Sequence, residues 1–319
     1  YRPWLEAAAG ALQRLAARPG FTYPHVPLPE PQEGTCILFC DALRFDLGQR
    51  LANALATRGY SSAVASHFAA LPTVTPTAKP AISPVHDQLM GGSNLDTAVR
   101  ATSTRVTIEV LRRLLADSDY QVLKGDDTGD PTGRAWTELA AIDAYGHEHG
   151  WKLAHHVSAE LRSLEWRIAA LLDAGWQRVV VVTDHGWLLL PGGLPKTELP
   201  EHLTTIRKGR CARLKDLSSV DQLTLPWYWD ANVRIAFAPG VSCFEAGKEY
   251  EHGGLSPQEC IVPVITFTRN GPSAAATEPV TIGQVTWRGL RCTVRVEGAT
   301  AGLRVDIRAK PGDPSTSLL

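Results

Sequence analysis

Aspartate and histidine side chains with the chemistry of metal ligands recur along the chain, several of them directly after short apolar segments. Carboxylate oxygens and imidazole nitrogens in combination suit Zn²⁺ or Mn²⁺. The candidate metal ligands are Asp41, Asp143, His147, Asp184, His185 and His252. A bound cation would lower the pKa of a nearby hydroxyl, so a threonine such as Thr75 could act as a nucleophile beside it.

The spacing of these residues supports two of the groupings. Asp143 and His147 are four residues apart, so both would lie on one face of a helix. Asp184 and His185 are adjacent, and adjacent side chains on a strand point to opposite faces. Both could therefore reach one site only where the strand has ended, and Gly186 allows such a tight departure.

Each residue also has an ordinary structural explanation. Taken alone, Asp41 is better explained as a helix N-cap, and Asp143 with its neighbouring histidine equally well as a cap and a surface residue. Asp184 fits a polar turn after a buried strand, and His252 fits a loop. Thr75 lies in a turn rich in proline and threonine, where a hydroxyl is common. Only the joint order of these motifs along the chain favours a metal site.

Strand-like and helix-like patterns alternate over most of the chain, which predicts an α/β fold with a mostly parallel sheet flanked by helices. The predicted strands are 36–40, 62–65, 139–142, 178–183, 233–237 and 261–266, and the predicted helices are 4–17, 43–56, 106–116 and 153–174. Ligands of such sheets bind beyond the carboxyl ends of the strands, so Asp41, Asp143 and Asp184 would lie along one edge. Residues 186–228 are expected to be irregular, as an insertion or an active-site lid.

Three parts are expected along the chain. Residues 1–33 would form an N-terminal helix and a Pro-rich linker, and residues 34–270 the α/β domain. Residues 271–319 would form a small antiparallel β module, because apolar residues alternate there with others, as in Leu303, Val305 and Ile307.

The composition is that of an ordinary globular protein. The 319 residues carry a net charge of −1, which gives no global basic signal for nucleic acid or anionic membrane. No apolar run approaches the length of a membrane span, so no membrane partner is expected. The six cysteines are scattered without paired metal-ligand spacing, which indicates a reducing, cytoplasmic location. The chain begins with Tyr1 rather than Met, so we expect a piece of a longer protein.

In their order along the chain, the motifs resemble the PglZ domain, a branch of the alkaline-phosphatase superfamily. The matching segments span residues 36–266 and read CDALRFDL, LPTVTPTAKPA, DAYGHEHG, VVTDHGW and HGGLSPQECIVPVI. The resemblance implies an alkaline-phosphatase-like fold with two divalent metal ions and Thr75 as the nucleophile. It places one ion with Asp143, His147 and His252, and the other with Asp41, Asp184 and His185.

The function implied by this resemblance is metal-dependent hydrolysis of phosphate esters. Thr75 would attack phosphorus, and water would hydrolyse the resulting phosphothreonine. Zn²⁺ is expected from three histidines and three aspartates, while Mn²⁺ and Mg²⁺ stay open. A monoester, a diester, a nucleotide or DNA would each fit this chemistry as the substrate.

The resemblance further implies a role in bacterial anti-phage defence of the BREX or phage-growth-limitation type, with other defence subunits as partners. One alternative is a non-catalytic scaffold subunit of such a complex. A sulfatase or phosphomutase of the same superfamily is another, although Thr75 stands where a typical sulfatase carries a formylglycine precursor.

Several cations could contact a substrate phosphate. Lys79 follows the candidate nucleophile and Arg44 follows Asp41, and each is either a phosphate contact or an ordinary surface cation. The basic segment 207–215 is either a solvated surface run, which we favour, or a clamp for phosphate oxygens or a nucleic-acid backbone.

Overall fold

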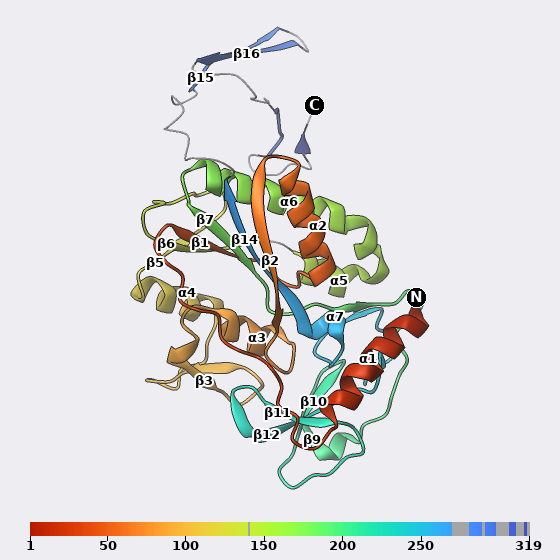
Figure 1. Ribbon diagram of the computed structural model, residues 1–319. Helices are drawn as coiled ribbons and strands as arrows, with labels where there is room; N and C mark the ends of the chain where they lie inside the picture. Colours follow the sequence, from red (N-terminus) through yellow and green to blue (C-terminus); the bar gives the residue numbers. More distant parts are fainter. Residues whose placement is uncertain (140, 270–280, 289–290, 298–305, 311–315, 318–319) are drawn as a thin grey trace. The chain divides into compact units, whose positions relative to one another are not determined.

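The computed structural model describes residues 1–139, 141–269, 281–288, 291–297, 306–310 and 316–317. The chain divides into two compact units, Tyr1–Thr268 and Arg269–Leu319. The first unit is built on a six-stranded sheet with the order β2-β14-β7-β1-β6-β5 (Figure 1). Its strands are β1 Thr35–Phe39, β2 Tyr60–Phe68, β5 Tyr120–Leu123, β6 Arg134–Glu138, β7 Arg178–Val182 and β14 Ile261–Arg269.

The centre of this sheet is parallel. Strand β1 pairs in parallel with both β6 and β7, and β5 pairs in parallel with β6. Strand β14 runs antiparallel to β7. All five residues of β1 are buried, as expected for a strand covered on both faces. The predicted fold class, a mostly parallel sheet flanked by helices, is confirmed.

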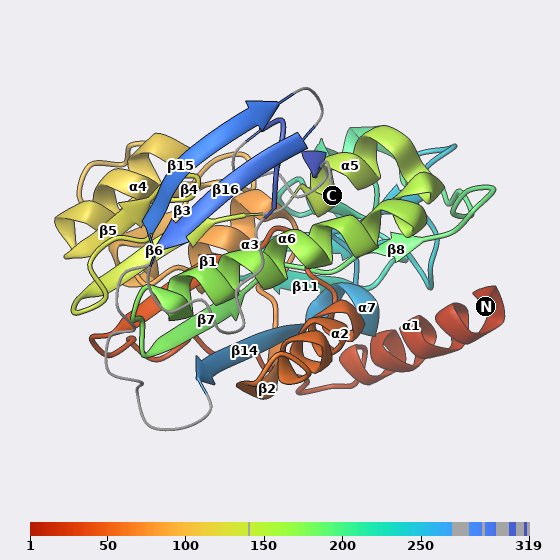
Figure 2. The same cartoon turned by 90° about the horizontal axis from the view of Figure 1, so that it is seen from above.

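Helices cover both faces of the sheet (Figures 1 and 2). Leucines of α2 and α6 pack with Leu38 on one face, whereas α3 and α4 contribute to the cluster around Ile37 and Phe39 on the other. The alternation of side chains along β1 therefore separates the two cores. The helices are α1 Arg2–Ala16, α2 Phe45–Ala56, α3 Thr75–Ile82, α4 Ile108–Asp117, α5 Ile142–His149, α6 Leu153–Asp173 and α7 Pro257–Cys260. None of them, over the described residues, is long and apolar enough to cross a membrane.

The prediction that residues 186–228 are irregular holds only in part. Three short strands of this segment belong to a second, antiparallel sheet with the order β11-β12-β10-β9, and α1 packs against it through Leu12 and Ala16. Its strands are β9 Thr204–Arg207, β10 Cys211–Leu214, β11 Thr224–Trp227 and β12 Asp230–Phe237. Three of them have four residues each, which is too short for a clear alternation of apolar and polar side chains.

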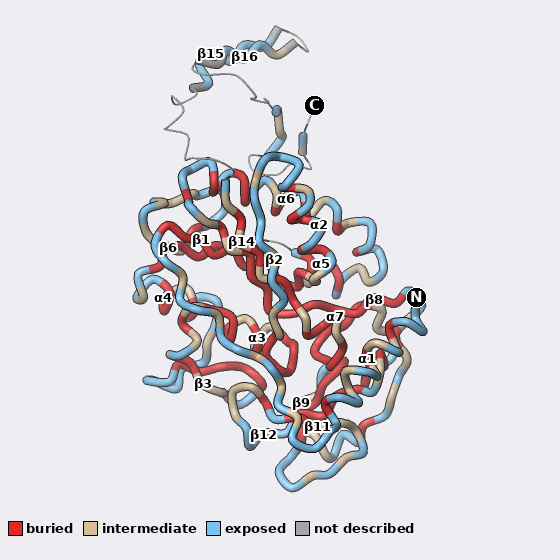
Figure 3. Tube along the Cα trace, viewed as in Figure 1, coloured by how far each residue is buried: buried red, intermediate tan, exposed pale blue. Residues whose placement is uncertain are grey.

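Two further strand pairs complete the first unit. They are β3 Leu89–Gly91 with β4 Thr97–Val99, and β8 Leu188–Leu189 with β13 Tyr250–Glu251. Burial continues from β7 into the turn that follows it, since residues 181–190 are all buried (Figure 3). The end of the sheet is therefore covered by well-packed chain, which can hold polar side chains in fixed positions.

The second unit contains an antiparallel hairpin of β15 Thr281–Arg288 and β16 Arg291–Glu297. This confirms a small antiparallel β element after the α/β part of the chain. Of the other residues that suggested strands there, Leu303 and Val305 lie outside the described residues. The expected three-part division at residues 33 and 270 stays a prediction.

A glycine of α2 sets how closely this helix approaches the sheet. A Cβ added at Gly48 would lie 2.7 Å from Cγ of Pro263 in β14. We expect Gly48→Ala to lower the free energy of unfolding by about 1–3 kcal/mol through overpacking. Gly10 in α1 is the matched control, because an added Cβ there would meet only the flexible Arg14 side chain, at 3.1 Å.

Gly10→Ala should instead raise the free energy of unfolding by up to about 1 kcal/mol, the gain in helix propensity. Urea denaturation of both variants measures the difference. Stabilisation by both substitutions would contradict the close contact between α2 and β14.

Candidate metal centre

The parallel register of β1 and β7 brings two of the candidate aspartates together. Phe39 pairs with Val182, and Asp41 and Asp184 each follow two residues later. The two turns are also bonded to each other, because the Ala42 amide donates to Asp184 Oδ1 at 3.3 Å and the Leu43 amide donates to Thr183 Oγ1 at 2.9 Å. The expectation that both carboxylates lie at the carboxyl edge of the sheet is confirmed.

Asp143 reaches the site from a helix rather than from a strand end. The predicted strand 139–142 is wrong, because β6 ends at Glu138 and Asp143 lies in the first turn of α5. The apolar character of this segment arises because Ile142 starts α5 and packs into the core between the sheet and its helices. Asp143 and His147 share one face of α5, with Oδ1 and Nε2 3.6 Å apart, as their spacing predicts.

One group of ligand atoms gathers around Asp143, His147 and His252. Nε2 of His252 lies 3.1 Å from Nε2 of His147 and 3.5 Å from Oδ1 of Asp143. The three ligand atoms all lie within 4.8 Å of one another, so one cation could contact all three.

A second group adjoins the first. Nε2 of His185 lies 3.4 Å from Asp184 Oδ2 and 3.7 Å from Asp41 Oδ1. Asp41, Asp143 and His185 also form a group within 4.8 Å, so Asp143 belongs to both groups. The rings of His185 and His252 stack with centroids 3.8 Å apart and planes 5° apart. The six expected ligands therefore meet in one place.

The candidate nucleophile lies at the same place. Thr75 Oγ1 is 3.1 Å from Nε2 of His185. The segment that was expected to be a Pro-rich turn becomes the N-terminus of α3, with Thr75 as the first helical residue and Pro76 in the first turn. Proline is favoured at that position, where its missing N–H costs nothing. The positive end of the helix dipole thus lies next to the Thr75 oxygen.

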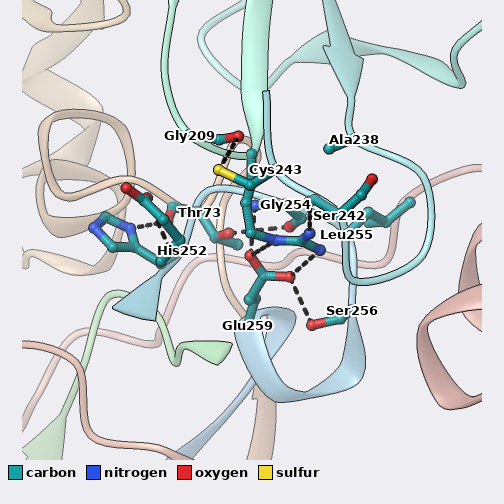
Figure 4. A network of polar contacts seen from close by, with 12 residues as sticks. Thr73, Gly209, Ala238, Ser242, Cys243, His252, Gly254, Leu255, Ser256 and Glu259 are labelled. Carbon is teal, nitrogen blue, oxygen red and sulfur yellow. Dashed lines mark hydrogen bonds and ion pairs between the residues drawn. The ribbon is translucent and has the colours of Figure 1, made fainter. Parts of the chain in front are cut away.

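Backbone contacts prepare two of the histidines as ligands. Nδ1 of His185 donates to the Gly186 carbonyl at 3.1 Å. Nδ1 of His252 donates to the Thr73 carbonyl at 2.8 Å, a contact drawn in Figure 4. Since a carbonyl can only accept, each Nδ1 carries a proton, and Nε2 is the ring nitrogen that faces the other candidate ligands. Such hydrogen bonds typically fix the orientation of metal-binding histidines.

Two buried carboxylate oxygens fit a cation better than an empty site. Asp41 Oδ1 and Asp184 Oδ2 are both shielded from solvent and have no hydrogen-bond partner among the described residues. Burial and the neighbouring Asp184 raise the pKa of Asp41 well above its usual value. Buried carboxylates that face each other are unfavourable unless positive charge compensates them. The donor set of carboxylates and neutral imidazoles therefore suits a divalent cation.

The electrostatics differ between the two histidines. Burial and the neighbouring His185 lower the pKa of His252 to about 3, so its imidazole is neutral, as a metal ligand must be. At His185, burial alone would lower the pKa, but the charges of Asp184, Asp143 and Asp41 outweigh it and raise the pKa, so a cation bound there would replace its second proton. Burial alone would raise the pKa of Asp143, but the neighbouring histidines lower it overall. Asp143 is therefore held as an anion between the two groups.

The sequence did not single out Tyr250, although it contacts a candidate ligand directly. Its hydroxyl donates to Asp143 Oδ1 at 2.8 Å, and its ring packs so closely on α5 that a Cβ at Gly146 would lie 2.4 Å from it. Tyr250 and His252 are two residues apart, the spacing of residues on one face of an extended segment, and this is the signal that could have identified it.

The cations near the site are mostly engaged in structural contacts. Lys79 Nζ lies 3.2 Å from Glu138, and Arg44 binds Asp46 through two hydrogen bonds of 2.8 Å. Within the basic segment 207–215, Arg210 is fully buried, so it cannot clamp a phosphate backbone. Lys208 is exposed, and its charge contributes to lowering the pKa of His147.

Similarity to known proteins is found among solved structures but not in sequence. No protein-family description matches it, and no curated protein matches it in sequence. Among solved structures, it is similar to murine ectonucleotide pyrophosphatase/phosphodiesterase 5, with a TM-score of 0.46 and 11% identity, covering 74% of this chain and 88% of that chain. The resemblance to the PglZ domain stays a prediction from the motifs.

Tyr250→Phe tests whether the phenol supports Asp143 as a ligand. Removing the hydroxyl should weaken the affinity of the metal-free protein for Zn²⁺ by about 10- to 100-fold, the usual effect of losing a partner of a metal ligand. Competition with a chromogenic chelator measures this affinity. Tyr145→Phe, on the helix α5 that carries Asp143, is the control, because the Tyr145 ring stacks on His156 instead of contacting Asp143. Equal affinities in both variants would contradict a role for the phenol.

Proposed function

We propose that the chain is a metal-dependent phosphohydrolase, a phosphodiesterase, phosphatase or nuclease, with Thr75 as its nucleophile. Asp41, Asp143, His147, Asp184, His185 and His252 would hold two divalent cations. Zn²⁺ is the expected ion, and Mn²⁺ or Mg²⁺ would also suit the carboxylates. The observation that carries this proposal is the pair of buried carboxylate oxygens of Asp41 and Asp184, which have no hydrogen-bond partner among the described residues. Both lie near Nε2 of His185, which contacts the Thr75 hydroxyl.

Cations held by these ligands would polarise the phosphoryl oxygens and lower the pKa of the Thr75 hydroxyl. Thr75 is half-buried, so its oxygen is reachable by a substrate. In the first step the Thr75 oxygen forms a bond to phosphorus while the bond from phosphorus to the leaving oxygen breaks. Water then cleaves the phosphothreonine and regenerates Thr75. The N-terminus of α3 favours the negative charge that develops on the oxygen and the phosphoryl group.

A cleft next to Thr75 supports the accommodation of a substrate. It has a volume of about 400 Å³ and runs between α3 and the start of α4. Lys79 and Arg105 line it, but each is paired with a carboxylate, at 3.2 Å from Glu138 and 2.7 Å from Asp96. The apolar walls include Pro76, Pro80, Val106, Ile108 and Leu111. A phosphate ester with a bulky leaving group, such as a nucleotide or DNA, would fit such a cleft.

The biological setting follows from the resemblance alone. We infer a cytoplasmic bacterial protein that acts in anti-phage defence of the BREX or phage-growth-limitation type, together with other defence subunits. A non-catalytic scaffold would keep the same fold but would not hydrolyse phosphate esters, so an activity measurement separates the two functions.

Thr75→Ala should reduce hydrolysis of bis-p-nitrophenyl phosphate and p-nitrophenyl phosphate by at least about 10³-fold, because the attacking oxygen is removed. Thr75→Ser keeps the oxygen and is the matched control, with activity within about tenfold of the unsubstituted protein. Both variants should bind Zn²⁺ with the same stoichiometry as the unsubstituted protein, since Thr75 is not needed to hold the cations.

Removal of metal with a chelator should abolish hydrolysis, and adding back Zn²⁺, Mn²⁺ or Mg²⁺ one at a time should identify the ion that restores it. Full activity of Thr75→Ala in metal-loaded protein would exclude Thr75 as the nucleophile. A protein that binds the cations but hydrolyses neither substrate would instead support the scaffold function.

A further inference from the structure

A fully buried ion pair lies beside the loop that carries His252. Arg210 in the turn before β10 and Glu259 in α7 are both 0% exposed, and two hydrogen bonds of 2.7 and 2.9 Å join them. Burying two charges is expensive, and a well-packed apolar pair is often as stable. The ion pair between Arg210 and Glu259 is therefore best explained by the way it positions the neighbouring chain segments.

The remaining hydrogen-bonding capacity of the pair is directed at nearby backbone. Arg210 also donates to the carbonyls of Gly240, at 3.0 Å, and Ser242. Glu259 accepts from the Ser256 hydroxyl at 2.6 Å and from the Gly254 amide at 2.8 Å. The pair therefore fixes the loop 252–256 on one side and the segment after β12 on the other.

From this loop the contacts continue to the metal centre (Figure 4). The Gly254 carbonyl accepts a hydrogen bond from the Thr73 hydroxyl at 3.1 Å. The Thr73 carbonyl in turn accepts from Nδ1 of His252 at 2.8 Å. The order of contacts is thus Arg210, Glu259, Gly254, Thr73 and His252, and Thr73 is only two residues before Thr75.

The atoms around Gly253 and Gly254 leave no space for larger side chains in the loop 252–256. Gly253 has a φ of +99°, and a Cβ there would lie 2.9 Å from Val74 Cγ1. A Cβ on Gly254 would lie 2.6 Å from the Arg210 guanidinium. The two glycines let the loop pass between the Thr75 segment and Arg210, but they offer no side chains to pack. Leu255 anchors the loop in an apolar cluster, whereas polar contacts fix the backbone at Gly254.

We propose that Arg210 and Glu259 are positioning residues of the metal centre. Their ion pair holds the loop 252–256 against the Thr73 backbone and so keeps Nε2 of His252 directed at Asp143 and His147. This inference rests on the proposed function, because it assumes that the Asp143–His147–His252 group binds a cation. Through Arg210, the second sheet would then also influence how tightly the Asp143–His147–His252 group binds its cation.

Glu259→Gln removes the charge and keeps the shape of the side chain. In this variant we expect the affinity of one of the two Zn²⁺ sites to fall by about 10- to 100-fold, while the other site stays unchanged. Arg207→Met is the matched control. It removes a cation of the same sheet that donates to the Leu199 and Phe244 carbonyls, and it should bind Zn²⁺ like the unsubstituted protein.

A measurement on metal-free protein separates this inference from the proposed function. In ¹⁵N spectra of histidine-labelled protein, His252 should be a neutral imidazole with its proton on Nδ1. In Glu259→Gln it should show a mixture of tautomers. If the unsubstituted protein binds no cation, the proposed function fails, and these spectra alone decide whether the ion pair positions His252.

A Glu259→Gln variant that is folded, with an unchanged His252 tautomer and unchanged Zn²⁺ affinities, would overturn the inference and leave the pair a purely structural contact. If Glu259→Gln does not fold, Thr73→Val decides. It leaves the ion pair intact but removes the hydroxyl that links Gly254 to Thr73. The inference then requires Thr73→Val to weaken one Zn²⁺ site and to perturb His252, and unchanged values would refute it.

Discussion

The proposed site depends on the parallel register between β1 and β7. This register places Asp41 and Asp184 next to each other, with Asp41 Oδ1 and Asp184 Oδ2 shielded from solvent. Two buried carboxylates repel each other, and the strain is not relieved by hydrogen bonds to Asp41 Oδ1 or Asp184 Oδ2 within the described residues. A divalent cation bound beside them would compensate this repulsion.

The other ligands come from the turn that also carries Asp184 and from two further segments, each held by a different kind of contact. Helix α5 supplies Asp143 and His147 at helical spacing, with Tyr250 bonded to Asp143. The turn after β7 supplies His185, whose ring is oriented by a hydrogen bond from Nδ1 to the Gly186 carbonyl. His252 follows β13 and lies outside a regular element; its ring stacks on His185, and its Nδ1 is fixed by the Thr73 carbonyl.

The alternation of strands and helices was sufficient to predict β1, β2, β7 and β14 of the central sheet and the convergence of Asp41 and Asp184, but it missed β5 and β6. The prediction from sequence failed where the local pattern of apolar residues does not match the element that tertiary packing stabilises. The apolar residues before Asp143 begin a helix instead of ending a strand, and the short strands of the second sheet lack a readable alternation. Ser256 and Glu259 have the spacing of a local helix-capping pair, and only the fold shows that Glu259 binds Arg210, 49 residues away.

The charge on residue 210 illustrates why a basic segment cannot be interpreted from composition alone. Arg207, Arg210 and Arg213 lie within seven residues, yet each donates to a different backbone carbonyl: those of Leu199, Gly240 and Ser93 respectively. A guanidinium offers several donors in a fixed plane, so it can satisfy carbonyls that a second sheet leaves unpaired at its edges and turns. The same property that would suit phosphate binding is used here to join chain segments. Lys208 is exposed instead, and together with burial and Lys248 its charge lowers the pKa of His147.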